Sequence, residues 1–304
     1  MDLKGPKLKD YMKKAVVVPG KKIKLSEIDT GWAQTERLKE LGEKKAEKKL
    51  IKMLEESRLA LADTQEVLWS DRGYSILIIL QGMDTAGKDG TIRHVMSGVN
   101  PQGCRVHGFK VPSTEEHSHD FLWRYTLDLP QRGEIGIFNR SYYEDVLVVK
   151  VHPDRLEDLP ERYGPCEKGF WEGRYRDINS FEEHLVRNGT LILKFFLHIS
   201  KKEQKQRLLD RLEHKDKYWK FSLGDLAERQ VWDQYEKAYE EMLIATSTDY
   251  APWFVVPSDY KWVARTFVAD TIVSAIEGLK LTYPKLDEKQ VKSLMEAKKQ
   301  LENE

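Results

Sequence analysis

Residues 74–97, YSILIILQGMDTAGKDGTIRHVMS, contain the pattern that decides the fold. The run from Ile76 to Leu80 is short, apolar and β-branched, which is typical of a strand buried on both faces. It leads through a loop of the form G-x-x-x-x-G-K, Gly82 to Lys88, into a segment of helical character. A strand, this loop and a helix in that order predict a phosphate-binding loop. Its glycines let backbone N–H groups approach a phosphate, the helix N-terminus adds partial positive charge, and Lys88 can reach the terminal phosphates.

Two residues of this loop depart from the common pattern. Asp89 follows Lys88 where a Ser or Thr usually supplies a hydroxyl to Mg²⁺, and Asp84 stands inside the loop. A carboxylate is a hard oxygen ligand that suits Mg²⁺, so we expect Asp84 to take over part of the metal binding. The alternative is a simple turn in which Lys88 is only solvated, and the strand and helix on either side argue against it.

Length and composition limit the classes of protein that remain. A chain of 304 residues can bury a large core, as one domain or as a domain with an appendage. Lys plus Arg and Asp plus Glu number 50 each, which argues against a protein devoted to nucleic acid and confines any polyanion site to a local patch. Cys104 and Cys166 lack metal or disulfide spacing, and no stretch resembles a signal peptide or a membrane span, so we expect a cytoplasmic protein without membrane contact.

The rest of the chain alternates between strand and helix patterns. Predicted strands cover 104–109, 134–138, 191–197 and 253–256, and predicted helices cover parts of 34–69 and then 114–129 (capped by Ser113), 170–187, 222–247, 259–279 and the residues after 284, with a loop at 152–168. This alternation predicts an α/β protein whose parallel sheet carries helices on both faces, a doubly wound P-loop kinase core. We expect an N-terminal arm and helices over 1–70, a core over 71–280 and a terminal helix over 281–304.

A second group of polar residues follows the predicted strand 134–138. Asn139, Arg140, Glu144 and Asp145 come directly after it. Open α/β sheets bind ligands at the carboxyl ends of their parallel strands. We therefore expect these four side chains to belong to the site.

Residues 201–220, KKEQKQRLLDRLEHKDKYWK, form a local cationic segment. They hold eight Lys or Arg against four acids, and Arg207 and Arg211 lie four apart on one helical face. Such a run is often only a solvated surface. Beside a phosphate-binding loop, a basic lid at about 201–222 that closes over phosphates is favoured.

Three motifs together resemble a known family. The strings GMDTAGKDGTIRHVM, IFNRSYYEDVLVVKVH and ISKKEQKQRLLDRLEHKDKYWKFSLGDLAER are similar to those of the family-2 polyphosphate kinases, over about residues 30 to 280. The resemblance implies a thymidylate-kinase-like fold and Mg²⁺-dependent transfer of phosphoryl groups between inorganic polyphosphate and nucleotides (AMP, ADP and ATP). By position, Asp84 and Lys88 match the loop residues of the family, Arg140 matches the arginine of the second motif, and Arg207 and Arg211 fall in its lid.

Asn139 stands where many members of that family have Asp. Asn139 with Glu144 five residues later resembles the third class of the family, which accepts both AMP and ADP. An amide cannot replace a metal-binding carboxylate, so the metal would depend on Asp84 or Glu144. A structural alternative is that Asn139 only caps the following helix.

Phosphoryl transfer needs positioning and neutralisation of charge more than covalent chemistry. We expect Asp84, Lys88, Asn139, Arg140 and Glu144 to act in catalysis, with Mg²⁺ on Asp84. The predicted phosphate-binding residues are Gly82, Gly87, Lys88, Asp89, Gly90, Arg93, Arg140, Arg207 and Arg211. A homo-oligomer, dimer or tetramer, is expected.

Two other functions remain open on the residues alone. An ATP-dependent nucleoside monophosphate kinase would share the loop and the lid, and an assay with polyphosphate as sole donor distinguishes the two. A P-loop switch or scaffold would bind nucleotide to change partners, and multiple turnover would exclude it.

Overall fold

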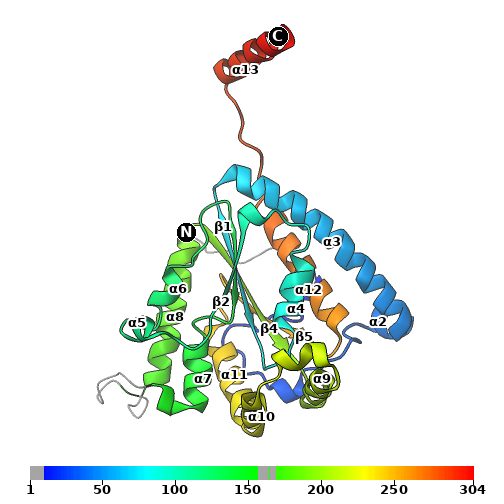
Figure 1. Ribbon diagram of the computed structural model, residues 1–304, viewed down its shortest axis with the longest axis vertical. Helices are drawn as coiled ribbons and strands as arrows, with labels where there is room; N and C mark the ends of the chain where they lie inside the picture. Colours follow the sequence, from blue (N-terminus) through cyan, green and yellow to red (C-terminus); the bar gives the residue numbers. More distant parts are fainter. Residues whose placement is uncertain (1–9, 157–163, 165–168) are drawn as a thin grey trace.

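The sheet has five parallel strands in the order β2-β3-β1-β4-β5, with the central strand β1 directly before the phosphate-binding loop (Figure 1). The structure is a computed structural model, and it describes residues 10–156, 164 and 169–304. The strands are β1 (Ser75–Gln81), β2 (Cys104–Gly108), β3 (Ile135–Asn139), β4 (Thr190–His198) and β5 (Trp253–Pro257). The predicted strands and the parallel α/β architecture are confirmed.

The register of the sheet brings two polar segments together. Every residue of β1 is buried, as its apolar run predicts. Leu80 of β1 pairs with Asn139 of β3, and Gln81 pairs with Phe196 of β4. Because parallel strands end at the same edge, the loop after Gln81 lies beside the residues that follow Asn139.

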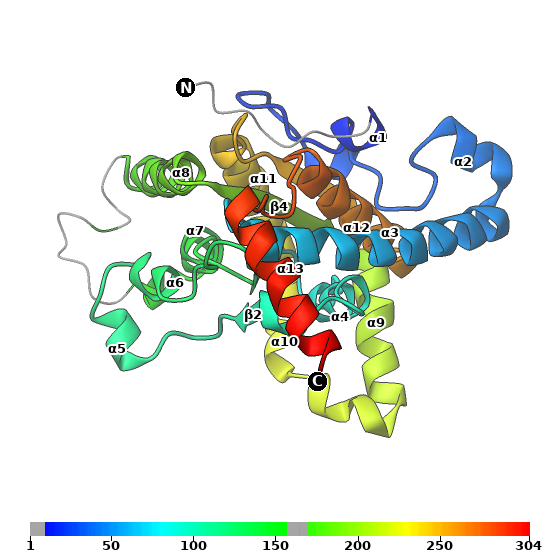
Figure 2. The ribbon, with the colours of Figure 1, turned by 90° about the horizontal axis from the view of Figure 1, so that it is seen from above.

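Helices cover both faces of the sheet (Figures 1 and 2). On one face α3 and α4 pack with α12, and on the other α11 packs with α7 and α8. Helices α9 and α10 lie at the edge where the strands end (Figure 1). The α-helices are α1 (Asp10–Lys13), α2 (Glu36–Leu41), α3 (Glu43–Asp71), α4 (Lys88–Val95), α5 (Thr114–His117), α6 (Trp123–Thr126), α7 (Glu144–Val151), α8 (Phe170–Arg187), α9 (Lys201–Glu213), α10 (Leu223–Gln230), α11 (Trp232–Thr246), α12 (Lys261–Glu277) and α13 (Glu288–Glu302).

The described part of the N-terminal arm lies along the open edge of the sheet. Val16 forms an antiparallel bridge with Phe254 of β5, and the Val17 N–H donates to Trp253 O at 2.9 Å. Met12 and Val17 are fully or almost fully buried. The arm therefore covers the edge strand β5, an edge that otherwise offers unpaired backbone groups.

The helix predicted for 114–129 is wrong in its length. The capping box of Ser113 with Glu116 is present, but α5 ends at His117 and a separate short helix, α6, begins at Trp123. Asp120 breaks the pattern, because its side chain accepts from the Leu122 N–H at 3.0 Å and its carbonyl accepts from the Trp123 N–H at 3.0 Å. Such a turn offers the backbone an alternative to continued helix.

The single helix predicted for 222–247 is also wrong, because the chain bends at Val231 between α10 and α11. The Arg229 guanidinium near the end of α10 donates to Lys201 O and to the Gln204 side chain of α9. Trp232, the first residue of α11, is buried. Tertiary contacts on the two sides of Val231 thus set different helix directions.

The ends of the described chain and the predicted loop complete the fold. Helix α13 stands apart from the body at the end of an extended linker (Figure 1). Among the residues that the structure describes, no helix combines the length and apolar character needed to cross a membrane. Most of the loop predicted at 152–168 lies outside the described residues.

Candidate phosphate-binding site

The loop between β1 and α4 has the backbone conformation that its glycines allow. Gly82 has φ +157°, and a Cβ there would lie 2.8 Å from Leu197 O of β4, so a side chain cannot be accommodated. Gly87, with φ +106°, is the N-cap of α4, and its carbonyl accepts from the Thr91 N–H at 2.8 Å. The first turn of α4 therefore faces the loop with its backbone N–H groups, as anion binding requires.

Lys88 folds back over this loop. Its Nζ donates to Gly82 O at 2.6 Å, with Met83 O at 3.4 Å. Burial first, and then the positive charge of Arg140, lower the pKa of Lys88 to about 8. The ammonium is thus partly desolvated and held at the mouth of the loop, where an anion would offset the unfavourable surroundings.

Arg140 links the loop to the second motif. It has a left-handed backbone, φ +67°, and its N–H donates to Leu80 O at 3.1 Å, which directs the side chain back across β1. Its guanidinium donates to Asp84 Oδ1 and to Glu144 Oε2, each at 3.0 Å. The charge of Glu144 and then that of Asp84 raise the pKa of Arg140 further above its usual range. The structure therefore brings Asp84, Arg140 and Glu144 together beside Lys88.

Asn139 connects the end of β3 to α4 rather than to α7. Its Nδ2 donates to Asp89 Oδ1 at 2.6 Å. Helix α7 begins at Glu144, its N-cap is Tyr143, and no side chain caps it. The structural alternative for Asn139, a cap on the following helix, is therefore not what the structure shows. Asp145 faces away from this group, because it accepts from Tyr125 Oη at 3.1 Å and lies 4.0 Å from Arg174.

Arg207 of α9 uses all of its donors inside the protein. Nε donates to Glu203 Oε1 at 2.8 Å, Nη1 donates to the carbonyls of Thr85 and Ala86 at 2.9 and 3.1 Å, and Nη2 donates to those of Ser258 and Asp259 at 2.6 and 3.0 Å. A guanidinium has only these five N–H groups. In this conformation Arg207 holds the phosphate-binding loop in place.

Arg211 lies one turn further along α9 and is also paired. Its Nη1 donates to Lys220 O at 2.7 Å and to Asp225 Oδ2 at 3.0 Å. These contacts connect α9 to the segment that follows it and to α10. The structure thus separates the two lid arginines: Arg207 contacts the loop, and Arg211 contacts the lid itself.

Two further cations near the loop were not predicted from the sequence. Arg265 Nη2 lies 3.6 Å from the position that a Cβ on Gly90 would occupy, and Lys261 lies one turn before it on α12. Burial, followed by the charges of Arg93 and Arg207, lowers the pKa of Arg265. Burial, followed by Arg207 and Arg265, likewise lowers the pKa of Lys261. The available signal was the Lys261–Arg265 pair at i, i+4 at the start of a helix that follows a strand.

The side chains of these cations lack direct partners among the described residues. Within the described part of the chain, the side chains of Arg93, Lys261 and Arg265 make no hydrogen bond or ion pair. We call these three residues the outer cationic group. Like charges close together favour binding of an anion between them.

Thr85 is a third residue that the sequence did not single out. Its backbone is left-handed, φ +65°, and its Oγ1 is buried without a hydrogen-bond partner among the described residues. An unpaired buried hydroxyl costs free energy and calls for an explanation. In the middle of a phosphate-binding loop, a bound ligand or its water would supply the missing partner.

The carboxylates of the site can bind Mg²⁺ only together with ligands from substrate and water. Among the described residues, no group of three or more His, Cys, Asp or Glu side chains could hold a metal ion by itself. Mg²⁺ commonly binds through one or two carboxylates together with substrate phosphates and waters. The Asp84 side chain, 29% exposed and beside the loop, suits that mode.

Comparisons with known proteins show the family of this chain. The family model described as polyphosphate kinase 2 matches residues 43–284. The chain is 52% identical over 245 residues to the ADP-polyphosphate phosphotransferase of Rhodopseudomonas palustris, covering 79% of this chain and 84% of that protein. It is 48% identical over 224 residues to the AMP/ADP-polyphosphate phosphotransferase of Meiothermus ruber, covering 74% and 80%. A crystal structure of polyphosphate kinase 2 from Arthrobacter aurescens superposes with a TM-score of 0.82 at 39% identity, covering 96% of this chain and 99% of the other.

Proposed function

Because the chain belongs to the polyphosphate kinase 2 family, we propose that it transfers phosphoryl groups between inorganic polyphosphate and AMP or ADP in a Mg²⁺-dependent reaction. The observation that carries the proposal is the convergence of Lys88, Arg140 and the outer cationic group on one phosphate-binding loop. An ATP-dependent nucleoside monophosphate kinase is the less favoured function, since the relatives are named for polyphosphate.

Lys88 and the backbone N–H groups of the loop bind the phosphoryl group that is transferred. The lysine lies against the loop carbonyls, and its charge stabilises the negative charge on the oxygens of that group. Arg140 is held by Asp84 on one side and by Glu144 on the other, so its guanidinium is oriented before a substrate arrives. Asp84 would hold Mg²⁺ together with phosphate oxygens, and the ion would supply neutralisation of part of the charge on those oxygens.

The donor polymer extends from the loop over the outer cationic group. Gly90 on α4 lies beside Arg265, so a phosphate chain leaving the loop along α4 would reach these cations first. Arg207 acts as a positioning residue, because its contacts hold the loop carbonyls of Thr85 and Ala86. Arg211 contributes through the lid rather than through a direct clamp on the polymer in the conformation described.

The range of acceptors is the finer part of the proposal. The Rhodopseudomonas relative is named for ADP and the Meiothermus relative for AMP and ADP. We assign acceptance of both nucleotides to the neutral Asn139, which pairs with Asp89 and adds no further negative charge beside the acceptor phosphates. Glu144 orients Arg140 and supports the phosphate and metal site.

Self-association is a further part of the proposal. The support for a homo-oligomer is that α13 stands away from the body and exposes Val291, Leu294 and Met295 on one side. Sedimentation of the full chain against a chain that ends before Glu288 tests it. Sedimentation of both chains as monomers would contradict it.

One activity assay tests the function itself. The purified chain is given long-chain polyphosphate as the sole donor, Mg²⁺, and AMP, ADP, GMP or GDP in turn. We expect multiple turnover with AMP and with ADP. Turnover with ATP as donor and none with polyphosphate would overturn the proposal in favour of an ordinary nucleotide kinase.

A further inference from the structure

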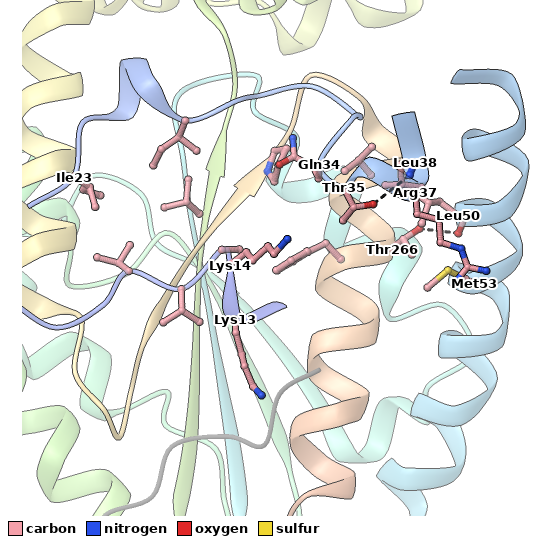
Figure 3. Close-up of a pocket in the computed structure, with 18 of the residues that line it drawn as sticks. Lys13, Lys14, Ile23, Gln34, Thr35, Arg37, Leu38, Leu50, Met53 and Thr266 are labelled. Atoms are coloured by element: carbon pink, nitrogen blue, oxygen red, sulfur yellow. Dashed lines mark hydrogen bonds between the residues drawn. The ribbon is translucent and has the colours of Figure 1, made fainter. Parts of the chain in front are cut away.

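A cavity of about 780 Å³ lies between the N-terminal arm, α2, α3, α12 and the end of β5 (Figure 3). None of the residues that line it belongs to the phosphate-binding loop or to the lid. Its walls are mostly aliphatic or aromatic and include Val16, Ile28, Leu38, Leu50, Met53 and Phe267. The volume lies within the range of small-molecule sites, roughly 300–1,000 Å³.

The charged residues that line this cavity are all basic in the described part of the chain. They are Lys13, Lys14, Lys21, Arg37 and Lys49, and no described Asp or Glu lines the cavity. In a chain with equal numbers of acidic and basic residues, such a bias is not explained by composition. In Figure 3 the Lys14 side chain extends from the arm toward the side of the cavity that carries Gln34 and Thr35.

Three of these cations have no partner to neutralise them. The side chains of Lys21, Arg37 and Lys49 make no hydrogen bond or ion pair with any residue that the structure describes. The charge of Lys14 acts on Glu36, whose pKa is lowered mainly by Lys39 and to a smaller degree by Lys14. An apolar cavity with unpaired cations at its rim matches a ligand with an apolar body and an anionic head.

We propose that this cavity binds an amphipathic anion, an aliphatic chain that ends in a carboxylate. The chain would lie against Leu38, Leu50 and Phe267, and the carboxylate would face the cations of the rim. A second copy of this protein is a poorer occupant: α13, which exposes an apolar side, carries four lysines against three acids and would be repelled by the rim. The proposal does not rest on the proposed phosphotransfer, because binding is measured without turnover.

Calorimetry of the full chain with decanoate tests the proposal, with decan-1-ol as the uncharged comparison. We expect decanoate to bind at one site per chain and at least about fivefold more tightly than decan-1-ol at low salt, with the difference shrinking as ionic strength rises. Equal affinities for the two ligands would overturn the anionic specificity.

Two pairs of variants test whether decanoate binds in this cavity. Arg37→Glu, at the rim, should weaken decanoate at least about fivefold, whereas Lys48→Glu, the same charge change on the exposed surface of α3 outside the cavity, should not. Met53→Trp fills the cavity and should abolish decanoate binding. Leu59, on the same helix, is 72% exposed, and Leu59→Trp should leave decanoate binding intact. Circular dichroism of each variant verifies the fold.

Three results would overturn the proposal. The first is that the native chain does not bind decanoate at millimolar concentration. The second is that Met53→Trp and Arg37→Glu are folded and both bind decanoate as tightly as the native chain does. The third is that the native chain dimerises and does not bind decanoate, while Met53→Trp stays monomeric. This result would assign the cavity to a second copy of the chain.

Discussion

Lys88 lies where β1, the phosphate-binding loop and α4 meet, and its state of charge depends on those surroundings. The motif in the sequence was enough to predict its place in the loop, because spacing and flanking elements determine it. Its contact with Gly82 O and its lowered pKa were not predictable, since the contact depends on the loop conformation, and the pKa depends on burial by the fold and on Arg140, which follows β3. The same holds for Asn139, whose partner Asp89 is 50 residues away in the chain.

The lowered pKa of Lys88 predicts a pH dependence. Lys88 is charged below about pH 8 and loses its charge above it, so kcat/KM for polyphosphate should fall about tenfold between pH 7 and pH 9. Because its folded pKa lies below the ordinary 10.5, the unfolded chain binds more protons in that window, and Lys88 makes the free energy of unfolding rise from about pH 8 to 10.5. A pH profile of kcat/KM checks the first point. Lys88→Arg, which stays charged, should remove this fall, and a fall that persists would assign the titration to another group.

A second prediction concerns Asn139 and Glu144. A fixed carboxylate in Asn139→Asp would repel Asp89 and the acceptor phosphates, so the ratio of AMP to ADP activity should change at least about threefold. Glu144→Ala removes a partner of Arg140 and should lower activity with both acceptors and raise the Mg²⁺ requirement. Initial rates with each nucleotide over a Mg²⁺ series measure both effects. An unchanged ratio together with a normal Mg²⁺ curve would contradict these roles.

Helix α9 shows what can and cannot be predicted at the scale of an element. Its basic character and helical spacing followed from the residues, because both are local, whereas the lid expected at about 201–222 contains a helix that ends at Glu213. The partners of Arg207 come from residues 85–86 and 258–259, which only the fold brings to α9. Asp259 adds to this link, since its Oδ1 accepts from the Ser200 N–H at 2.7 Å and its Oδ2 from Thr30 Oγ1 at 2.7 Å. The helices predicted at 114–129 and 222–247 failed for the same reason: turn and tertiary contacts outweighed helical spacing.

Separate variants of the two lid arginines should behave differently. Arg207→Ala frees the carbonyls of the phosphate-binding loop, so it should lower kcat about 10²-fold with AMP and with ADP alike. Arg211→Ala should act mainly on the apparent affinity for polyphosphate, through the closure of the lid. Lys205→Ala, on the exposed side of α9, is the control and should change little. Steady-state kinetics with both substrates varied distinguish these cases, and a purely polyphosphate-specific defect in Arg207→Ala would contradict its positioning role.

At the scale of the whole molecule, a buried ion pair stands behind the second motif. Lys194 in β4 and Glu182 in α8 are both 0% exposed and lie 2.6 Å apart. Tyr142 and Tyr143, which follow Arg140, each donate a hydroxyl hydrogen bond to Glu182 Oε1. The burial of the charged Lys194 was not predicted, because the surrounding residues of its strand are apolar and show no partner for it. The network ties β4, α8 and the segment between Arg140 and Glu144 into one unit.

Breaking this pair should destabilise the whole fold. Lys194→Met leaves the Glu182 carboxylate buried without its cation and should lower the free energy of unfolding by about 3–5 kcal/mol. Lys194→Met with Glu182→Gln removes both charges and keeps an acceptor for the tyrosines, so it should be less destabilised than the single variant. Urea unfolding of the two variants measures the difference in their free energies of unfolding. Equal free energies would contradict the prediction, because they would show that the buried Glu182 carboxylate does not destabilise the fold when its cation is removed.

The most direct test of the central claim is phosphorus NMR of Mg²⁺, AMP and polyphosphate with the native chain and with Lys88→Ala. With the native chain, polyphosphate should shorten while the α- and β-phosphate signals of ADP appear, followed by the signals of ATP. Lys88→Ala should slow this conversion by about 10²-fold or more, because a loop charge on the transferring phosphate is lost, while its circular dichroism and melting temperature stay close to native. Polyphosphate consumption at a near-native rate by a well-folded Lys88→Ala chain, or none by the native chain, would contradict the account.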